Sequence, residues 1–333
     1  MGKIVALGEV VADIYRTSSG GSGQAAELPF VAHPGGAPAN LAMATAKLGS
    51  EAAFIGRVGE DLFGDFILRA LESGGVEVSG VNRCESPTRT SIAFVEVAED
   101  GDRSFTFYRT TPAADELLSP EDIATDVLSG ADFLTFGSIP LLREPSRSAV
   151  WRAVELAREL GVPVAFDVNL REHLWESLAA AKREVLPLLE HSTVLKLSDD
   201  ETEPLTGAPD PESAADELLA RGIPLVLITL GAQGVFYATA DFRGNVPSFP
   251  ATAVDATGAG DAFTAAALSH LASGKVWDEG RVRAAAVRGA AAGALVCEAF
   301  GAMAALPTRE EVECVISSGS TAGPTAGPTA GPG

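Results

Sequence analysis

Strand-like and helix-like segments alternate along most of this chain, and that alternation constrains the fold more than any other feature. Because strands separated by helices pair in parallel and need cover on both faces, the sequence predicts an α/β fold with a mostly parallel sheet between helical layers. Short apolar runs predict strands at 4–7, 52–55, 133–136, 164–167, 193–197 and 225–229, and helices are expected at 35–49, 65–73, 147–160, 178–189 and 214–220.

Two segments do not follow this alternation. Residues 91–97 and 103–108 alternate apolar and polar side chains around an acidic, glycine-containing turn, which is typical of a β-hairpin. We expect this hairpin and the segment 13–31 to form a small β lid, spanning about 13–31 and 91–111, outside the main sheet. Residues 1–312 would then be one domain, and the Thr-Ala-Gly-Pro repeats near the end predict a disordered tail over 313–333.

A glycine-punctuated turn precedes an alanine-rich helical run. Residues 254–263 read Val-Asp-Ala-Thr-Gly-Ala-Gly-Asp-Ala-Phe. Gly258 and Gly260 leave room for a ligand, and amides at a helix N-terminus bind anions such as phosphate. Asp261 beside that anion makes chemical sense as the base that takes a proton from a group attacking the phosphate. Taken alone, the string also fits an ordinary tight turn.

This string resembles the signature of the pfkB family of sugar kinases, also called the ribokinase family, with Ala256 as its one departure. The resemblance implies a ribokinase-like three-layer α/β/α sandwich with a small β lid. It also implies ATP-dependent phosphorylation of a primary sugar hydroxyl, with Asp261 as catalytic base. The transferred phosphate would be held by the amides of Gly258, Ala259 and Gly260.

Further motifs match the family in order, from about Lys3 to Thr308. Each has a plainer explanation by itself: a helix start, a loop acid, a surface arginine or a helix N-cap. Phe-Tyr-Arg at 107–109, followed by Ala-Asp at 114–115, resembles the fructokinase branch and implies that fructose is converted to fructose 6-phosphate. The sugar-binding residues implied by the resemblance are Asp13, Gly35, Gly36, Asn40, Phe107, Arg109, Arg171 and Asp261.

The same resemblance implies a nucleotide site and two cation sites. Arg171 would also approach the transferred phosphate, and Glu201 would organise Mg²⁺ through water. The implied nucleotide-side residues are Asn169, Lys196, Thr229, Gly231, Gly234, Gly258 and Gly260. The implied K⁺ site is Asp255, Thr257, Val296, Ala299 and Gly301, although residues 297–300 depart from the usual polar run.

Composition excludes several classes of partner. A formal net charge of −21 argues against nucleic acid and anionic membranes, which need basic patches. Three scattered cysteines predict a reducing, cytoplasmic location. The family resemblance implies a small sugar and ATP as partners, and a second copy of the chain docked through the lid is also expected.

Other activities stay open. A kinase of this family could act on 2-keto-3-deoxygluconate, ribose or a nucleoside. A sugar acid needs a second cation, for which Arg109 is a candidate, whereas an aromatic fraction of 6% disfavours a nucleoside slot. The alternative from another class is a catalytically silent, sugar-binding regulatory protein, which the intact Gly-Ala-Gly-Asp string disfavours.

Overall fold

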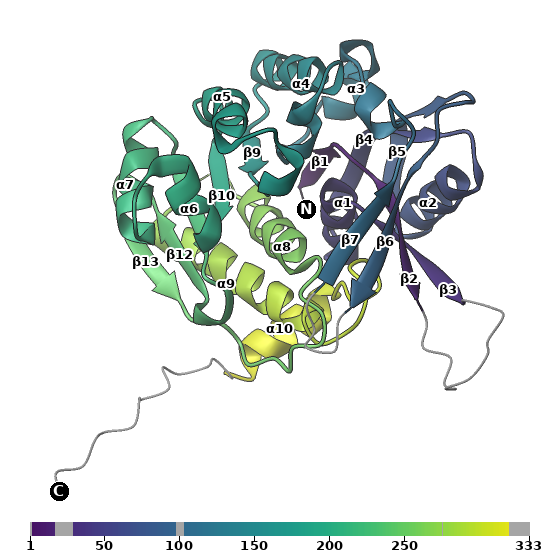
Figure 1. Cartoon of the computed structure of the whole chain (residues 1–333). Helices are drawn as coiled ribbons and strands as arrows, with labels where there is room; N and C mark the ends of the chain where they lie inside the picture. Colours follow the sequence, from purple (N-terminus) through teal and green to yellow (C-terminus); the bar gives the residue numbers. More distant parts are fainter. Residues whose placement is uncertain (1, 17–28, 98–102, 275, 320–333) are drawn as a thin grey trace, which may run out of the picture.

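A nine-stranded sheet runs through the computed structural model, which describes residues 2–16, 29–97, 103–274 and 276–319 (Figure 1). Neighbouring strands pair in parallel except at one edge, where β11, β12 and β13 are antiparallel. Its strands, in spatial order, are β13 (Arg243–Val246), β12 (Val235–Ala238), β11 (Leu225–Thr229), β10 (Val194–Ser198), β9 (Val164–Asp167), β8 (Phe133–Phe136), β1 (Lys3–Leu7), β4 (Glu51–Gly59) and β5 (Val76–Cys84).

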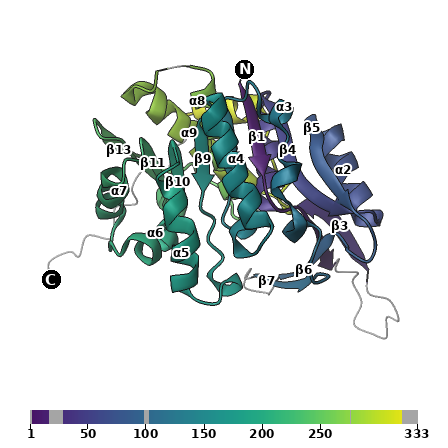
Figure 2. The ribbon, with the colours of Figure 1, turned by 90° about the horizontal axis from the view of Figure 1, so that it is seen from above.

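Helices cover both faces of this sheet, which confirms the predicted α/β/α sandwich (Figure 2). Alternate residues of β1 point to opposite layers, so Ile4 packs in one core and Val5 in the other. One layer contains α1 (Ala37–Lys47), α2 (Leu62–Ser73), α8 (Ala259–Ala272), α9 (Glu279–Val296) and α10 (Arg309–Ser317); the other contains α3 (Thr125–Leu128), α4 (Ser146–Leu160), α5 (Leu178–Leu189), α6 (Asp199–Thr206) and α7 (Pro211–Ala220).

A separate four-stranded sheet forms the predicted lid. Its order is β3 (Phe30–Gly35), β2 (Val11–Arg16), β6 (Ser91–Val97) and β7 (Arg103–Tyr108). The hairpin strands β6 and β7 have the bounds that the sequence predicted. The expected lid segment 13–31 is described only in part, since residues 17–28 lie outside the described chain.

Several elements escaped the sequence prediction, and two of them, β5 and α9, show why. The strand β5 is an edge strand with many exposed polar side chains, so it lacks the apolar run of a buried strand. The helix α9 packs on α8 through alanine and glycine, so it has no stripe of large apolar residues. The predicted domain boundary at residue 312 stays a prediction, although α10 spans that position. From residue 320 onward, the predicted tail lies outside the described residues.

The strand β1 lies where the order of the sheet reverses, with β4 on one side and β8 on the other. In open α/β sheets, ligands bind beyond the carboxyl ends of strands at such a point. The loops after β1, β9, β10 and β11 all open on that edge. Over the described residues, none of the helices combines the length and apolarity that crossing a membrane would need.

Candidate active site

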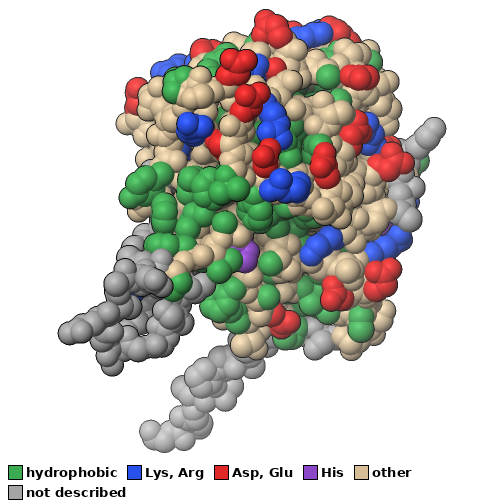
Figure 3. All heavy atoms as spheres, turned by 90° about the vertical axis from the view of Figure 1, so that its right-hand side faces the viewer, with side chains coloured by type: hydrophobic (Ala, Val, Ile, Leu, Met, Phe, Trp, Pro, Cys, Tyr) green, Lys and Arg blue, Asp and Glu red, His purple; other side chains and the backbone are tan. Residues whose placement is uncertain are grey.

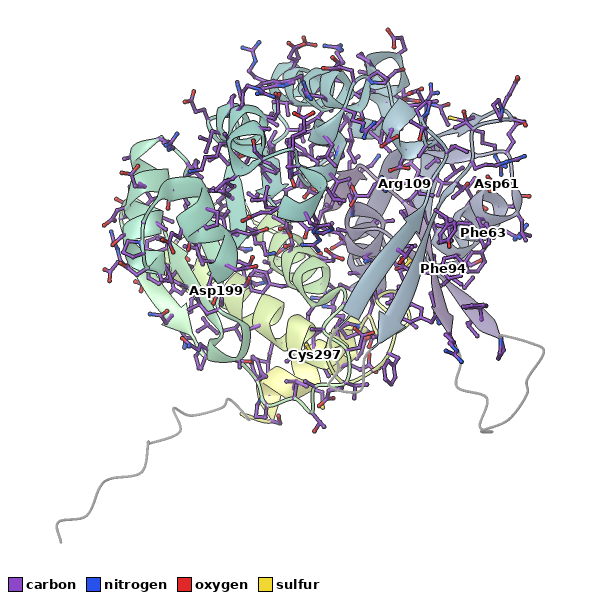
Figure 4. The ribbon with its side chains drawn as sticks, in the orientation of Figure 1. Asp61, Phe63, Phe94, Arg109, Asp199 and Cys297 are labelled. Atoms are coloured by element: carbon purple, nitrogen blue, oxygen red, sulfur yellow. The ribbon has the colours of Figure 1, made fainter. Side chains whose placement is uncertain are left out.

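Two cavities open on the carboxyl edge of the main sheet, and they meet at the start of α8. The lid-side cavity, of about 820 Å³, lies between the lid and the sheet, and the α9-side cavity, of about 590 Å³, lies beside α9. Ala253, Ala256 and Gly260 line both. Figure 4 labels Arg109 near the lid strands, and Asp199 and Cys297 at the ends of α6 and α9 that border the second cavity.

Most of the predicted site residues line the lid-side cavity. They come from six parts of the chain, because the loops after several strands converge there. The predicted residues among its lining are Asp13, Gly36, Asn40, Arg109, Asn169, Arg171, Lys196, Asp255, Thr257, Gly258, Gly260 and Asp261.

Asp261 stands in the first turn of α8, at the junction of the two cavities. The Nδ2 of Asn40 donates a hydrogen bond of 2.8 Å to its Oδ2. Burial raises the pKa of the Asp261 carboxyl to about 6, although the hydrogen bond from Asn40 acts in the opposite direction. The carboxylate is therefore mostly ionised at neutral pH and able to accept a proton.

The turn before Asp261 requires glycine. Gly258 has a φ of 86°, and a Cβ there would lie 3.0 Å from the Cβ of Ala302. The amide of Ala259 donates to the carbonyl of Ala256 at 3.2 Å. The amides of Gly260 and Asp261 belong to the first helical turn, where no earlier carbonyl of the helix can accept them. These two amides are the candidates for binding an anion.

A buried ion pair lies beside Gly260. The Nζ of Lys196 is 3.0 Å from Oδ1 of Asp167, and Thr264 donates to Oδ2 of the same carboxylate at 2.7 Å. Burial acts to lower the pKa of Lys196, but the charges of Asp167 and Glu201 outweigh it and hold that pKa above its ordinary value. A Cβ on Gly260 would lie 3.2 Å from Nζ, so the missing side chain leaves the ammonium close to the junction.

The double glycine at the end of β3 makes room for Asp13. A Cβ on Gly35 would collide with the Asp13 carboxylate, and Gly36 has a φ of 101°. Gly35 therefore acts through Asp13, since it does not itself line the cavity. Burial raises the pKa of Asp13 to about 7, and the charge of Asp255 adds to the effect.

The α9-side cavity is lined mainly by small residues and backbone. Thr229, Gly231, Gly234 and Gly260, all predicted on the nucleotide side, line it. Asn169, Lys196 and Gly258 were predicted on the same side, but they line the lid-side cavity instead. Asn169 follows β9 and Lys196 lies on β10, and both strands lie nearer the centre of the sheet than β11 does.

Glu201 stabilises the start of α6 and the loop after β9 through hydrogen bonds from backbone amides. It is 5% exposed and closes a capping box at the start of α6, accepting a 2.8 Å hydrogen bond from the amide of Ser198. Its other oxygen accepts from the amide of Leu170, which fixes the loop carrying Asn169 and Arg171. Both carboxylate oxygens are thus engaged by backbone, and Glu201 lines neither cavity.

The five predicted K⁺ residues are brought into one region. Asp255 accepts hydrogen bonds from the amides of Thr257 (2.7 Å) and Gly301 (2.9 Å), and Val296 and Ala299 belong to the segment ending at Gly301. The carbonyl of Val296 accepts from the amide of Ala299 at 3.4 Å. Within the described ranges, no group of three or more His, Cys, Asp and Glu side chains could hold a metal ion.

The site also contains a residue that the sequence prediction missed. Glu9 lines the lid-side cavity and is 5% exposed, and its Oε2 has no hydrogen-bond partner among the described residues. Burial raises its pKa to about 8. Its place directly after β1 was the available signal. The predicted Phe107 belongs to β7, but its side chain lies outside the described part of the structure.

Comparison with known proteins places these features in a family. The model of the pfkB family carbohydrate kinases matches residues 1–309. The fructokinase-2 of Solanum lycopersicum is 40% identical over 324 residues, which cover 96% of this chain and 97% of that protein. A double mutant of the Vibrio cholerae O395 fructokinase, in fructose, ADP and potassium ion bound form, is 33% identical with a TM-score of 0.85, covering 95% of this chain and 98% of that chain. Aminoimidazole riboside kinase from Salmonella enterica, complexed with aminoimidazole riboside and an ATP analog, is 29% identical with a TM-score of 0.82, covering 95% and 99% of the two chains.

Proposed function

The chain belongs to the pfkB family of carbohydrate kinases, and from that premise we propose that it transfers the γ-phosphoryl group of ATP to a primary hydroxyl of fructose. The product would be fructose 6-phosphate. The observation that carries the proposal is the position of Asp261, an ionisable carboxylate at the junction of two cavities. The similarity to fructokinases supports fructose as the sugar.

In this proposal the sugar occupies the lid-side cavity and the nucleotide occupies the α9-side cavity. The sugar oxygen forms a bond to the γ-phosphorus, the bond from that phosphorus to the β-phosphate oxygen breaks, and ADP leaves. Asp261 takes the hydroxyl proton while Asn40 orients its carboxylate. The ammonium of Lys196 and the amides of Gly260 and Asp261 would stabilise charge on the transferred group.

The cations are proposals of the same kind. Mg²⁺ would be carried by the nucleotide phosphates and neutralise their charge. Glu201 would reach it only through water, because its oxygens are already engaged by backbone amides. The carbonyls near Asp255 and Gly301 would hold K⁺. Replacing K⁺ by a bulky organic cation at constant ionic strength, and removing Mg²⁺ with a chelator, test the two requirements separately.

The outer face of the lid supports a homodimer formed through it. The rings of Phe30 and Phe94 lie 5.3 Å apart, and those of Phe94 and Tyr108 lie 5.0 Å apart. Phe30, Val31 and Tyr108 are 45%, 43% and 62% exposed. Figure 3 shows hydrophobic side chains gathered on the side of the molecule that carries the lid. Light scattering of the wild type and a Tyr108→Asp variant tests this arrangement.

A cytoplasmic location stays a prediction from the cysteines.

The proposed substrate is tested by measuring ADP release with fructose, ribose, 2-keto-3-deoxygluconate, adenosine and aminoimidazole riboside. We expect the highest kcat/KM for fructose. The last compound is included because of the similarity to aminoimidazole riboside kinase. A tenfold preference for another sugar would overturn the substrate. Sugar binding without any ADP release would point instead to a regulatory protein.

A further inference from the structure

Arg109 is surrounded by carboxylates on the side away from the cavity. Its Nη2 lies 3.2 Å from Oδ2 of Asp115, and its Nη1 lies 3.9 Å from Oε1 of Glu116. Both acids belong to one short turn of 3₁₀ helix, Asp115–Leu117. Asp115 is 3% exposed at its side chain, and its other oxygen accepts a 2.5 Å hydrogen bond from the hydroxyl of Ser91. The positive charge of Arg109 is thus balanced by groups of the protein itself.

Glu9 belongs to the same group of side chains as Arg109, Asp115 and Glu116. It lines the lid-side cavity and also a small pocket shared with Arg109, Asp115 and Glu116. Its Oε2 is buried with no hydrogen-bond partner among the described residues. Burial, with the charge of Asp115 adding to it, raises the pKa of this carboxyl, so it retains a proton at neutral pH and can donate to a hydroxyl. We call Glu9, Asp115 and Glu116 the acidic wall.

The other cations near the cavity are either paired within the protein or screened by water. Lys196 is paired with Asp167 at 3.0 Å. Arg171 lines the cavity from the loop after β9, but its side chain is exposed, so water screens its charge. Arg143 contacts Glu116 at 3.6 Å, but its side chain is 64% exposed, so water screens its charge. A substrate carboxylate placed beside Arg109 would therefore lose its hydration without gaining an uncompensated cation.

We propose that the acidic wall holds Arg109 as a charge-balanced hydrogen-bond donor, and that this makes the lid-side cavity select neutral sugars over sugars that carry a carboxylate. The inference deepens the proposed sugar kinase activity and rests on it. Neutral hydroxyls suit the wall because Glu9 can donate to them and Arg109 can donate without giving up its partners. A sugar acid would have to compete with Asp115 and Glu116 for the same guanidinium.

The test compares kcat/KM for fructose with kcat/KM for 2-keto-3-deoxygluconate in variants of the wall. Glu116→Gln and Asp115→Asn each remove one partner of Arg109 and nearly preserve the shape of the side chain. We expect each to lower the ratio of fructose to sugar acid by roughly tenfold, since one lost charge interaction of about 1.4 kcal/mol changes an equilibrium by that factor. The Kd of gluconate, measured by calorimetry, should fall in parallel.

Asp122→Asn is the matched control. Asp122 also pairs with an arginine, Arg57, at 2.7 Å, but it lies away from both cavities. This variant should leave the ratio unchanged. If Asp115→Asn fails to fold, Glu116→Gln decides, because Glu116 is more exposed than Asp115. An unchanged ratio and gluconate Kd in a folded Glu116→Gln variant that still phosphorylates fructose would overturn the inference. A wild-type protein that phosphorylates no sugar would instead overturn the proposed function.

Discussion

The two cavities that meet at Asp261 are lined by different kinds of residue. The lid-side cavity contains the buried carboxyl groups of Glu9, Asp13 and Asp255, together with charged or amide side chains from several loops. The α9-side cavity is lined mainly by alanine, glycine and other small residues. The lid-side cavity thus presents many charged and polar groups, several of them buried, whereas the α9-side cavity presents mainly small side chains and backbone.

In the proposed function, this difference would solve two recognition problems within one fold. A small sugar offers only hydroxyls, so it needs donors and acceptors placed around it, and burying those groups raises the pKa values of Glu9 and Asp13. A nucleotide offers phosphates and a flat ring, which helix N-termini and small side chains accommodate. Changes on the lid side should therefore affect sugar affinity and pH dependence, and changes on the α9 side should affect nucleotide affinity.

The largest effect is expected at the junction. Asp261→Asn removes the proton acceptor while keeping the shape of the side chain, so kcat should fall by roughly 10²–10⁴. Calorimetry should show fructose and ATP still binding, because neither cavity is blocked. A kcat within threefold of the wild type, in a folded variant, would remove Asp261 from the chemistry.

The same carboxylate predicts the pH dependence of the reaction. Because burial raises the pKa of Asp261 to about 6, the proposed base would be protonated and inactive below that pH. The kcat of the wild type should therefore fall on the acid side, by about tenfold per pH unit. An acid limb near the ordinary value for a carboxyl would mean that another group controls the rate.

The comparison between cavities is sharpened by one substitution in each. Arg109→Ala on the lid side should raise the KM for fructose about tenfold with little effect on the KM for ATP. Ala290→Phe on the α9 side should do the reverse, because it fills space beside α9. About tenfold corresponds to the loss of one good contact.

Two controls match these substitutions. Arg83→Ala removes an arginine paired with Asp65 on the protein surface, and Ala284→Phe adds the same ring on α9 outside either cavity. Neither should change a KM. If Arg109→Ala and Ala290→Phe raised both KM values equally, the division of sugar and nucleotide between the two cavities would be wrong.

The smallest expected effect is on stability. Glu9 has a higher pKa in the folded protein than its ordinary value of 4.5, so the folded state keeps a proton that the unfolded state has lost. Its presence therefore lowers stability progressively as pH rises from about 4.5 to about 8. Glu9→Gln should raise Tm by roughly 2–4 °C at pH 8 and have little effect at pH 5. An equal change at both pH values would show that Glu9 does not titrate in this way.

Local patterns were enough to predict much of the fold. The strands β1, β8, β9, β10 and β11 and the hairpin β6–β7 have short, regular apolar patterns, and their predicted bounds agree closely with the structure. The strand β5 and the helix α9 were missed, because each is stabilised by a neighbour rather than by its own pattern: β5 by pairing along β4, and α9 by packing on α8.

The sequence by itself determined the chemistry that this chain can carry: a glycine turn at a helix start, followed by Asp261, and polar residues after successive strands. Only the tertiary structure decided the surroundings of those residues. Burial raised the pKa of Glu9, and chain folding placed Asp115 and Glu116 against Arg109. Desolvation and charge pairing depend on groups brought together from distant parts of the chain, so no local pattern contains them.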